Sequence, residues 1–202
     1  MKRSIAIVIA VIIAALSGFF AVQAAQETSA RAAVIMDVNS NRVLYSKNMH
    51  EKLPMASTTK IMTTLVAIES GKLDEKVTVS KRASHMEGSS IYLREGEKHT
   101  VSDLLYAIML RSGNDSAVAV AEHIGGSVEG FAEMMNKKAR EIGANNTRFA
   151  NPHGLDAEGH YTTAYDLALI TSYALKNPIF SRIVSSKKKI IEGPPDENWD
   201  RV

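Results

Sequence analysis

Two short motifs in this 202-residue chain combine hydroxyl, amine and amide side chains at spacings that could support acyl transfer. Ser57 and Lys60 are three residues apart, which places two side chains on one face of a helix. A lysine desolvated beside a serine hydroxyl can lose its proton and then activate that serine as a nucleophile. Backbone N–H groups at a helix start also favour a developing oxyanion. We therefore expect Ser57 to be a nucleophile and Lys60 its base.

The second motif is Ser112-Gly113-Asn114, in a predicted turn between two apolar helices. Such a turn would bring a hydroxyl and an amide to one place, where Ser112 could relay a proton and Asn114 could bind a substrate carbonyl. The structural alternative is a helix cap, because serine and asparagine are favoured there.

Both motifs recur elsewhere in the chain. S-x-x-K is repeated at 186–189 and S-x-N at 46–48. About one S-x-x-K is expected by chance in a chain of this length and composition. The predicted position in the fold favours the copies at Ser57 and Ser112, since Ser57 precedes an apolar helix and Ser112 lies between two helices. The other copies fall in a lysine-rich run and at the end of an exposed strand.

Hydrophobic periodicity predicts the elements that must hold these groups. An Asn/Ser turn joins two β-branched runs as a hairpin, and most of the remaining chain is helical. The predicted elements are strands 32–38 and 43–47, a helix over 55–69 ending near Gly71, extended pieces 76–79 and 90–93, helices 100–111, 116–124, 127–143 and 163–176, and a short last helix from Pro178. Thr163 and Asp166 are spaced as a helix-capping pair, and residues 145–160 are irregular.

The N-terminus has the pattern of an export signal. Lys2 and Arg3 precede an apolar run over 5–16, and V-Q-A follows at 22–24. Small residues at the last and third-last positions suit signal peptidase, so we expect residues 1–24 to be a signal peptide. The alternative is an uncleaved membrane helix, since the apolar stretch is nearly long enough to span a bilayer. Either way, the rest of the chain, 25–202, would lie outside the cytoplasm.

Composition removes several other functions. The chain has no cysteine, which excludes disulfides, cysteine-bound zinc, a thiol nucleophile and a lipid-modified N-terminal cysteine. Lys2 and Arg3 supply the formal net charge of +2, so a nucleic-acid partner is not supported. With 45% hydrophobic residues the chain is expected to bury an ordinary core.

Together the motifs resemble those of the penicillin-recognising serine enzymes, which carry S-x-x-K, S-x-N and then K-[TS]-G. More narrowly, the chain is similar to the low-molecular-weight D-alanyl-D-alanine carboxypeptidases over roughly residues 30–185. The segments that carry this resemblance are AAVIMDVNSNRVLYSKN, LPMASTTKIMTTLVAIE, LLYAIMLRSGNDSAVAVAEHIGGS and FANPHGLDAEGHYTTAYDLALI.

The resemblance implies an α+β fold of the β-lactamase/transpeptidase type and a role for each motif residue. Ser57 would attack the penultimate D-Ala carbonyl of a peptidoglycan stem peptide and become acylated, with Lys60 as base. Ser112 would shuttle the proton and Asn114 would hold the acyl donor. β-Lactams would acylate the same serine, and neither a metal nor an organic cofactor is implied. The protein would act outside the cytoplasm, in the cell envelope or periplasm, in wall synthesis and cell shape.

One part of the family pattern is missing, because the sequence contains no K-T-G, K-S-G or H-T-G. The resemblance therefore implies the N-terminal part of a catalytic domain over 25–202, mostly its helical part plus the hairpin, without the later sheet strands. It also implies membrane association through a lost C-terminal segment or an uncleaved N-terminal helix.

Four alternatives remain open at this point. A non-catalytic or vestigial wall-binding protein would explain the missing motif. A class A β-lactamase would require a deacylating glutamate, for which only Glu158 is at hand, and it usually reads S-D-N where this chain has Gly113. A Ser-His-Asp site lacks a G-x-S-x-G elbow, and a metal site at His153, Asp156 and His160 lacks H-E-x-x-H.

Overall fold

The computed structural model describes residues 28–194, 200 and 201. The predicted signal peptide over 1–24 lies outside these residues. The chain divides into two compact units between Arg31 and Ala32, and the second unit contains all of the elements below.

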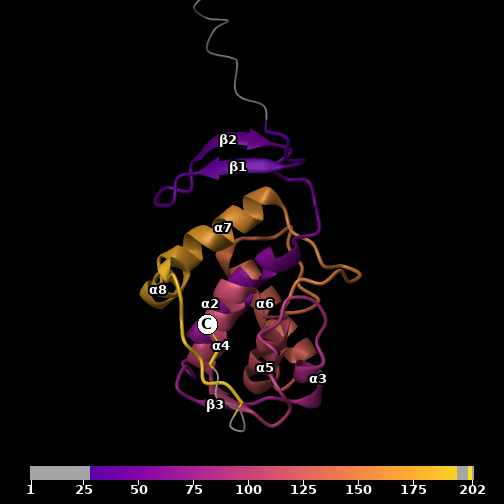
Figure 1. The fold of residues 1–202 in the computed structure, drawn as a ribbon. Coiled ribbons are helices and arrows are strands. Elements are labelled where there is room, and N and C mark those ends of the chain that lie inside the picture. The colour runs from indigo at the N-terminus through magenta and orange to yellow at the C-terminus, as the bar shows by residue number, and fades with distance from the viewer. Residues whose placement is uncertain (1–27, 195–199, 202) are drawn as a thin grey trace, which may run out of the picture. The chain divides into compact units, whose positions relative to one another are not determined.

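The second unit is α+β, as predicted, with one hairpin followed by a mainly helical body (Figure 1). In chain order the elements are β1 (Ala33–Met36), β2 (Val43–Lys47), the 3-10 turn η1 (Ala56–Thr58), α2 (Thr59–Glu69), β3 (Lys76–Thr78), α3 (Lys81–Ser84), β4 (Lys98–Thr100), α4 (Val101–Arg111), α5 (Asn114–Gly125), α6 (Val128–Ile142), α7 (Ala164–Leu175) and α8 (Pro178–Ser185). The predicted hairpin and the long helices are therefore confirmed.

Two small antiparallel sheets form, and one of them differs from the prediction. β1 pairs with β2, and β3 pairs with β4. The expectation of an extended piece at 90–93 is wrong. The backbone N–H groups of Ile91 and Leu93 donate to the buried carboxylate of Asp115, so they are not available to a strand. The partner of β3 is β4 instead, which the sequence pattern did not indicate.

Helix α2 forms the centre of the body. Nine of its 11 residues are buried, and it packs against α4, α5, α6, α7 and α8. Met62 and Leu65 supply its apolar contacts, with 1% and 0% of their surface exposed. The hairpin packs through β1 on α7, at the far side of α7 from the other helices (Figure 1). Burial on every side explains why α2 can hold polar groups away from water.

Helix starts follow the predicted caps with two corrections. Thr100, Ser127, Thr163 and Asn177 each accept a backbone N–H from the first turn of the helix that follows. Such caps each contribute about 1 kcal/mol.

The first correction concerns Asp166, whose side chain does not cap α7. It accepts from the N–H of Asn146 and from the hydroxyl of Thr147, and so ties the irregular loop to α7. The second is that α5 begins at Asn114, two residues before the predicted 116. At the end of α2, Ser70 is the C-cap and Gly71 follows it with φ of 74°.

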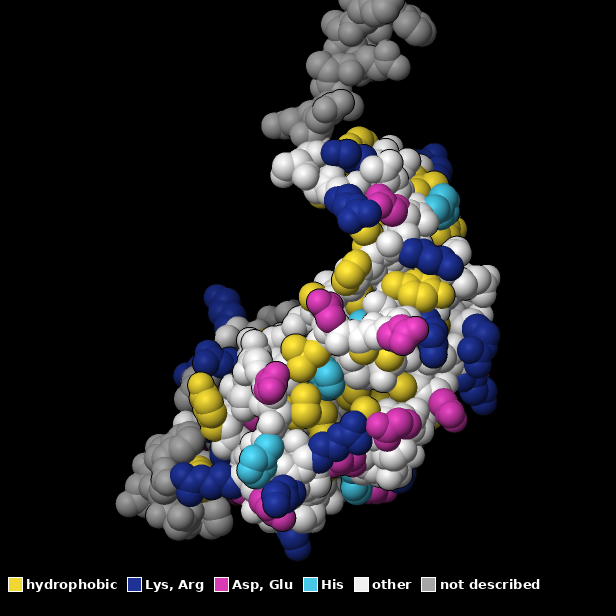
Figure 2. Space-filling model, turned by 90° about the vertical axis from the view of Figure 1, so that its right-hand side faces the viewer, with side chains coloured by type: hydrophobic (Ala, Val, Ile, Leu, Met, Phe, Trp, Pro, Cys, Tyr) yellow, Lys and Arg dark blue, Asp and Glu magenta, His cyan; other side chains and the backbone are white. Residues whose placement is uncertain are grey.

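The surface mixes charge and apolar side chains. On the face drawn in Figure 2, Lys and Arg side chains are interspersed with Asp and Glu side chains. Ile35 and Leu44 of the hairpin are 57% and 58% exposed. Within the described part of the chain, no helix has both the length and the apolar character needed to cross a bilayer.

Candidate active site

The predicted nucleophile lies in the turn that precedes α2. Ser57 is exposed in η1, and Ala56 before it has a left-handed backbone with φ of 46°. Helix α4 ends at Ser112, which is also left-handed with φ of 58°, and α5 begins after Gly113. Left-handed backbone is unfavourable for residues other than glycine and is concentrated at functional sites. Both serines therefore lie at or beside strained points between two elements.

The four residues identified from the sequence meet around the Lys60 amine. Lys60 Nζ lies 2.7 Å from Asn114 Oδ1 and 3.3 Å from Ser57 Oγ. Ser112 donates its hydroxyl hydrogen to Ser57 Oγ over 3.0 Å. Ser112 does occupy the C-cap position of α4, but its side chain bonds the other serine instead of the helix backbone. The turn between α4 and α5 thus brings a hydroxyl and an amide to one place.

Burial prepares Lys60 to act as a base. The residue is 2% exposed, and this desolvation lowers the pKa of its ammonium to about 8. The negative charge of Asp115 opposes the shift by raising that pKa. At neutral pH a tenth of the molecules would then hold a neutral amine, which is far more than an exposed lysine provides. Asp115 directly follows the S-x-N motif, but nothing in the sequence pattern distinguishes it from an exposed helix-start carboxylate.

A further acceptor, a backbone carbonyl, fixes the orientation of the Lys60 amine. His153 accepts from Lys60 Nζ through its backbone carbonyl over 2.6 Å. A neutral amine has two N–H bonds and one lone pair. If the two N–H bonds go to His153 and Asn114, the lone pair faces the hydroxyl of Ser57. The 3.3 Å separation is long for a hydrogen bond, as is common before substrate binds.

The His153 carbonyl reaches Lys60 because the Asn-Pro-His-Gly segment packs closely on the nucleophile turn. Gly154 has φ of 94°, and a β-carbon there would collide with the Ala56 carbonyl and lie 3.0 Å from Ser57 N. The amide oxygen of Asn151 accepts from the N–H of Gly154 over 2.7 Å. The Asn-Pro-His-Gly string belongs to one of the segments that carry the family resemblance, but nothing in the sequence indicates that a backbone carbonyl from it reaches Lys60.

A second histidine joins the same loop to α2. Ala150 N donates to His160 Nδ1 over 3.1 Å, so the proton of the neutral ring is on Nε2, 2.8 Å from Thr59 Oγ1. Burial lowers the pKa of His160 and favours this neutral form. His160 therefore positions the loop against the first turn of α2.

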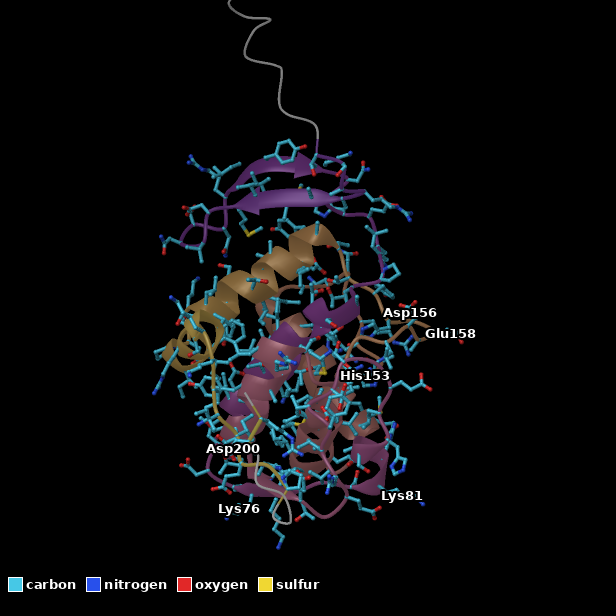
Figure 3. All side chains as sticks on the ribbon, viewed as in Figure 1. Lys76, Lys81, His153, Asp156, Glu158 and Asp200 are labelled. Carbon is cyan, nitrogen blue, oxygen red and sulfur yellow. The ribbon has the colours of Figure 1, made fainter. Side chains whose placement is uncertain are left out.

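Two alternatives drawn from this loop are not supported by its geometry. Within residues 28–194, 200 and 201, no three metal-ligating side chains cluster, and the ring nitrogens of His160 are both engaged. Figure 3 shows Asp156 and Glu158 at the outer end of the loop, away from His153. Glu158, the glutamate considered for a β-lactamase, is exposed at this outer end of the loop.

The second copies of the motifs lie elsewhere. Ser186 is the C-cap residue of α8 and donates to the carbonyl of Arg182, while Lys189 pairs with Asp103 over 2.9 Å. Lys187 and Lys188 are exposed, as predicted for a solvated run. The S-x-N copy at 46–48 lies at the end of strand β2 of the hairpin.

An α+β body in which a buried lysine contacts one of two hydrogen-bonded serine hydroxyls is the arrangement expected of a serine acyl-transfer protein. Comparison with known proteins identifies the family. The family model described as D-alanyl-D-alanine carboxypeptidase matches residues 19–198, and the chain belongs to this family.

Individual relatives agree with this assignment. The chain is 42% identical over 190 residues to the D-alanyl-D-alanine carboxypeptidase DacF of Bacillus subtilis, covering 89% of this chain and 49% of the relative. Among solved structures, a D-alanyl-D-alanine carboxypeptidase from Mycobacterium tuberculosis is 30% identical with a TM-score of 0.80, covering 86% of this chain and 65% of that one. A variant of a Streptomyces DD-transpeptidase is 33% identical with a TM-score of 0.80, covering 87% and 72%. The chain spans about half the length of the curated relatives it matches.

Proposed function

We propose that this protein is a serine D-Ala-D-Ala carboxypeptidase that acts on peptidoglycan stem peptides through an acyl-enzyme on Ser57. Membership of the family supports the reaction class. The observation that carries the assignment of residues is the buried Lys60 amine, held by Asn114 and His153 with its third direction toward Ser57.

The chemical steps follow from this arrangement. Neutral Lys60 accepts the proton of Ser57 as Oγ attacks the carbonyl of the penultimate D-Ala. Asn114 binds the acyl donor, and the backbone N–H of Ser57 is one donor to the oxyanion. Ser112 relays the proton from Lys60 to the leaving nitrogen, so that the C–N bond breaks and D-Ala departs. Water then hydrolyses the ester, with the same groups acting in the reverse direction.

The N-terminal pattern completes the proposal. Residues 1–24 are a signal peptide that exports the protein, so that 25–202 act in the cell envelope or periplasm, in wall synthesis and cell shape. An uncleaved N-terminal helix, or a C-terminal segment beyond this chain, would instead associate the protein with the membrane. Mass determination of the N-terminus after export distinguishes a cleaved signal peptide from an uncleaved helix, since cleavage after Ala24 removes the first 24 residues.

The test of the site is acylation by a fluorescent penicillin, carried out on the complete gene product. We expect a covalent label that Ser57→Ala abolishes. The matched control is Ser186→Ala, which alters the S-x-x-K copy at 186–189 and should retain the label. An unlabelled parent, or a label that persists in Ser57→Ala, would overturn the proposal.

Two further assays separate the proposal from its alternatives. Release of D-Ala from a peptide ending in D-Ala-D-Ala requires a peptidase and contradicts a non-catalytic wall-binding protein. Rapid nitrocefin turnover would instead indicate a β-lactamase, and we expect a stable acyl-enzyme because Glu158 is exposed at the outer end of its loop.

A further inference from the structure

Backbone strain points to a residue that the proposed chemistry does not use. Among the described residues, five that are not glycine have positive φ: Asn41, Asn48, Ala56, Tyr92 and Ser112. Asparagine tolerates this conformation in turns, and Ala56 and Ser112 belong to the candidate active site. That leaves Tyr92, with φ of 61°. A bulky side chain in this region is strained and persists only where its surroundings impose it.

The surroundings fix the backbone of Tyr92 from one side through Asp115, which is 1% exposed. Its carboxylate accepts from Ser90 Oγ at 2.6 Å and from the N–H groups of Ile91 and Leu93, each at 3.1 Å. The N–H of Tyr92 donates to Ser90 Oγ over 2.8 Å. Three consecutive N–H groups are therefore held, directly or through Ser90, by one buried carboxylate.

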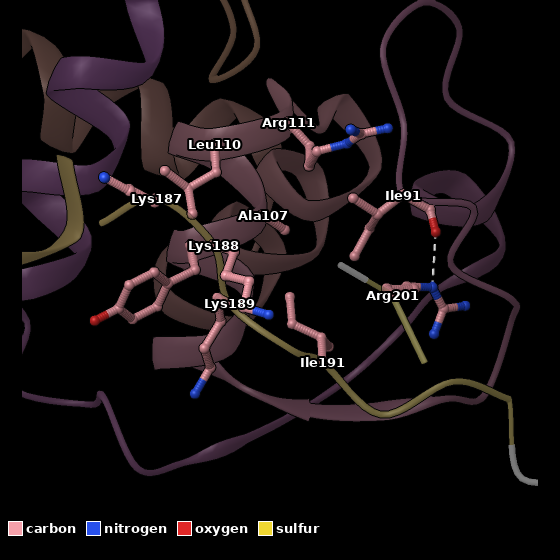
Figure 4. Close-up of a pocket in the computed structure, with 10 residues that line it drawn as sticks. Ile91, Ala107, Leu110, Arg111, Lys187, Lys188, Lys189, Ile191 and Arg201 are labelled. Carbon is pink, nitrogen blue, oxygen red and sulfur yellow. Dashed lines mark hydrogen bonds between the residues drawn. The ribbon is translucent and has the colours of Figure 1, made fainter. Parts of the chain in front are cut away.

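Arg201 holds the carbonyl groups of the same segment. Its Nε donates to Ile91 O over 2.7 Å (Figure 4), and its Nη2 donates to Tyr92 O over 2.9 Å. The guanidinium is buried and pairs with Glu97 over 3.1 Å. Arginine donates in a fixed planar fork, so the two carbonyls are held in a defined orientation.

The segment that carries Tyr92 is also attached to the candidate active site. Asn114 donates its backbone N–H to Ser89 O and its side-chain amide to Glu87 O, both over 2.7 Å. Ile91 lines a cavity of about 190 Å³ together with Arg111, the residue before the catalytic candidate Ser112. Tyr92 thus belongs to a segment whose hydrogen bonds help to position Asn114, the residue proposed to hold the acyl donor.

The side chain of Tyr92, in contrast, contributes little to packing. It is 78% exposed, the largest value among the exposed large hydrophobic side chains of the described residues. Burial does not offset its strained backbone, so stability alone does not account for a tyrosine at this position. On a segment that is hydrogen-bonded to Asn114, an exposed aromatic ring is instead available to contact a ligand.

We propose that Tyr92 is a specificity-determining residue whose ring contacts the acyl-donor peptide, N-terminal to the bond that is cleaved and beside Asn114. The identity of this ligand rests on the proposed function. The ring would add contact area to the peptide and would not take part in proton transfer.

The test uses the special backbone of Tyr92. Glycine adopts φ of 61° without strain, so Tyr92→Gly removes the ring and relieves the backbone together. In a Ser57→Ala background, which prevents turnover, we expect Tyr92→Gly to bind an acetylated peptide ending in D-Ala-D-Ala about tenfold more weakly by calorimetry. Its thermal midpoint should equal or exceed that of the parent. Tyr92→Phe retains the ring and should bind within about twofold of the parent.

The matched control is Tyr173→Ala, which removes a 42% exposed ring from α7 and should leave peptide binding unchanged. Peptide binding by Tyr92→Gly within twofold of the parent would overturn the inference, as would a Ser57→Ala parent that binds no peptide. Penicillin labelling of the protein with Ser57 intact reports on the proposed function separately. A labelled parent with unaltered binding by Tyr92→Gly refutes this inference alone.

Discussion

The chain carries S-x-x-K at Ser57 and again within the run 185–189, and comparing the first copy with the one at Ser186 shows what converts a sequence pattern into a candidate site. At Ser57 and Lys60 the lysine is 2% exposed, and three acceptors surround its amine. At Ser186 and Lys189 the lysine side chain is 37% exposed and reaches a carboxylate, while the serine bonds a helix carbonyl. The spacing is the same, so the difference comes from what other parts of the chain place around the lysine.

The largest expected effect comes from removing each lysine amine in turn. Lys60→Met keeps a long apolar side chain and removes the base, so acylation by penicillin should fall about 10²- to 10⁴-fold. Lys189→Met breaks only a partly exposed ion pair and should leave acylation within twofold. Stopped-flow measurement of the acylation rate compares them. Equal losses in the two variants would show that burial does not distinguish the copies.

Local sequence was sufficient to distinguish the motifs at Ser57 and Ser112 from their other copies, because both come from segments with strong helical periodicity. The turn at Ser112 and the existence of α2 follow from apolar spacing and break residues, although α2 begins at Thr59 after a 3-10 turn and not at 55 as predicted. What local sequence could not predict is the third acceptor, since the His153 carbonyl comes from a loop without periodicity and is brought in over 93 residues. A backbone acceptor also has no residue type by which to recognise it.

A second comparison, between two glycines, tests how closely the loop that contains His153 must approach the turn that contains Ser57. Gly154 and Gly96 have similar φ values of 94° and 84°, but only at Gly154 would a β-carbon meet other atoms, those of Ala56 and Ser57. Both alanine variants should lose about 1 kcal/mol of stability from the backbone alone. Gly154→Ala should in addition displace the nucleophile turn and slow acylation about 10²-fold. Acylation rates and urea unfolding of both variants check this, and a rate that falls equally in Gly96→Ala would contradict it.

The sheet illustrates the same limit of local sequence. The alternation at 90–93 resembles a strand, yet Asp115 takes the N–H groups that a strand would share. A buried carboxylate from a distant helix outweighs a weak local preference, because leaving such a group without hydrogen bonds is costly. The strand that forms, β4, is only three residues long and pairs through tertiary context.

The smallest expected effect is a pH dependence that belongs to one copy of the motif only. Because burial lowers the pKa of Lys60 to about 8, the neutral base becomes more abundant as pH rises to that value. Acylation should increase about tenfold per pH unit below 8 and level off above it. Burial and the Lys60 charge lower the pKa of His153 to about 4, so its ring stays neutral across this range and contributes no inflection near 8. Replacing Asp115 by asparagine removes the charge that raises the pKa of Lys60, and should move the midpoint of the acylation profile below 8. Profiles of acylation rate against pH from 6 to 9.5, measured for the parent and for Asp115→Asn, give the two midpoints. A flat profile, or a midpoint that rises in Asp115→Asn, would mean that Lys60 is not the base and that the contrast between the two motifs lies in packing alone.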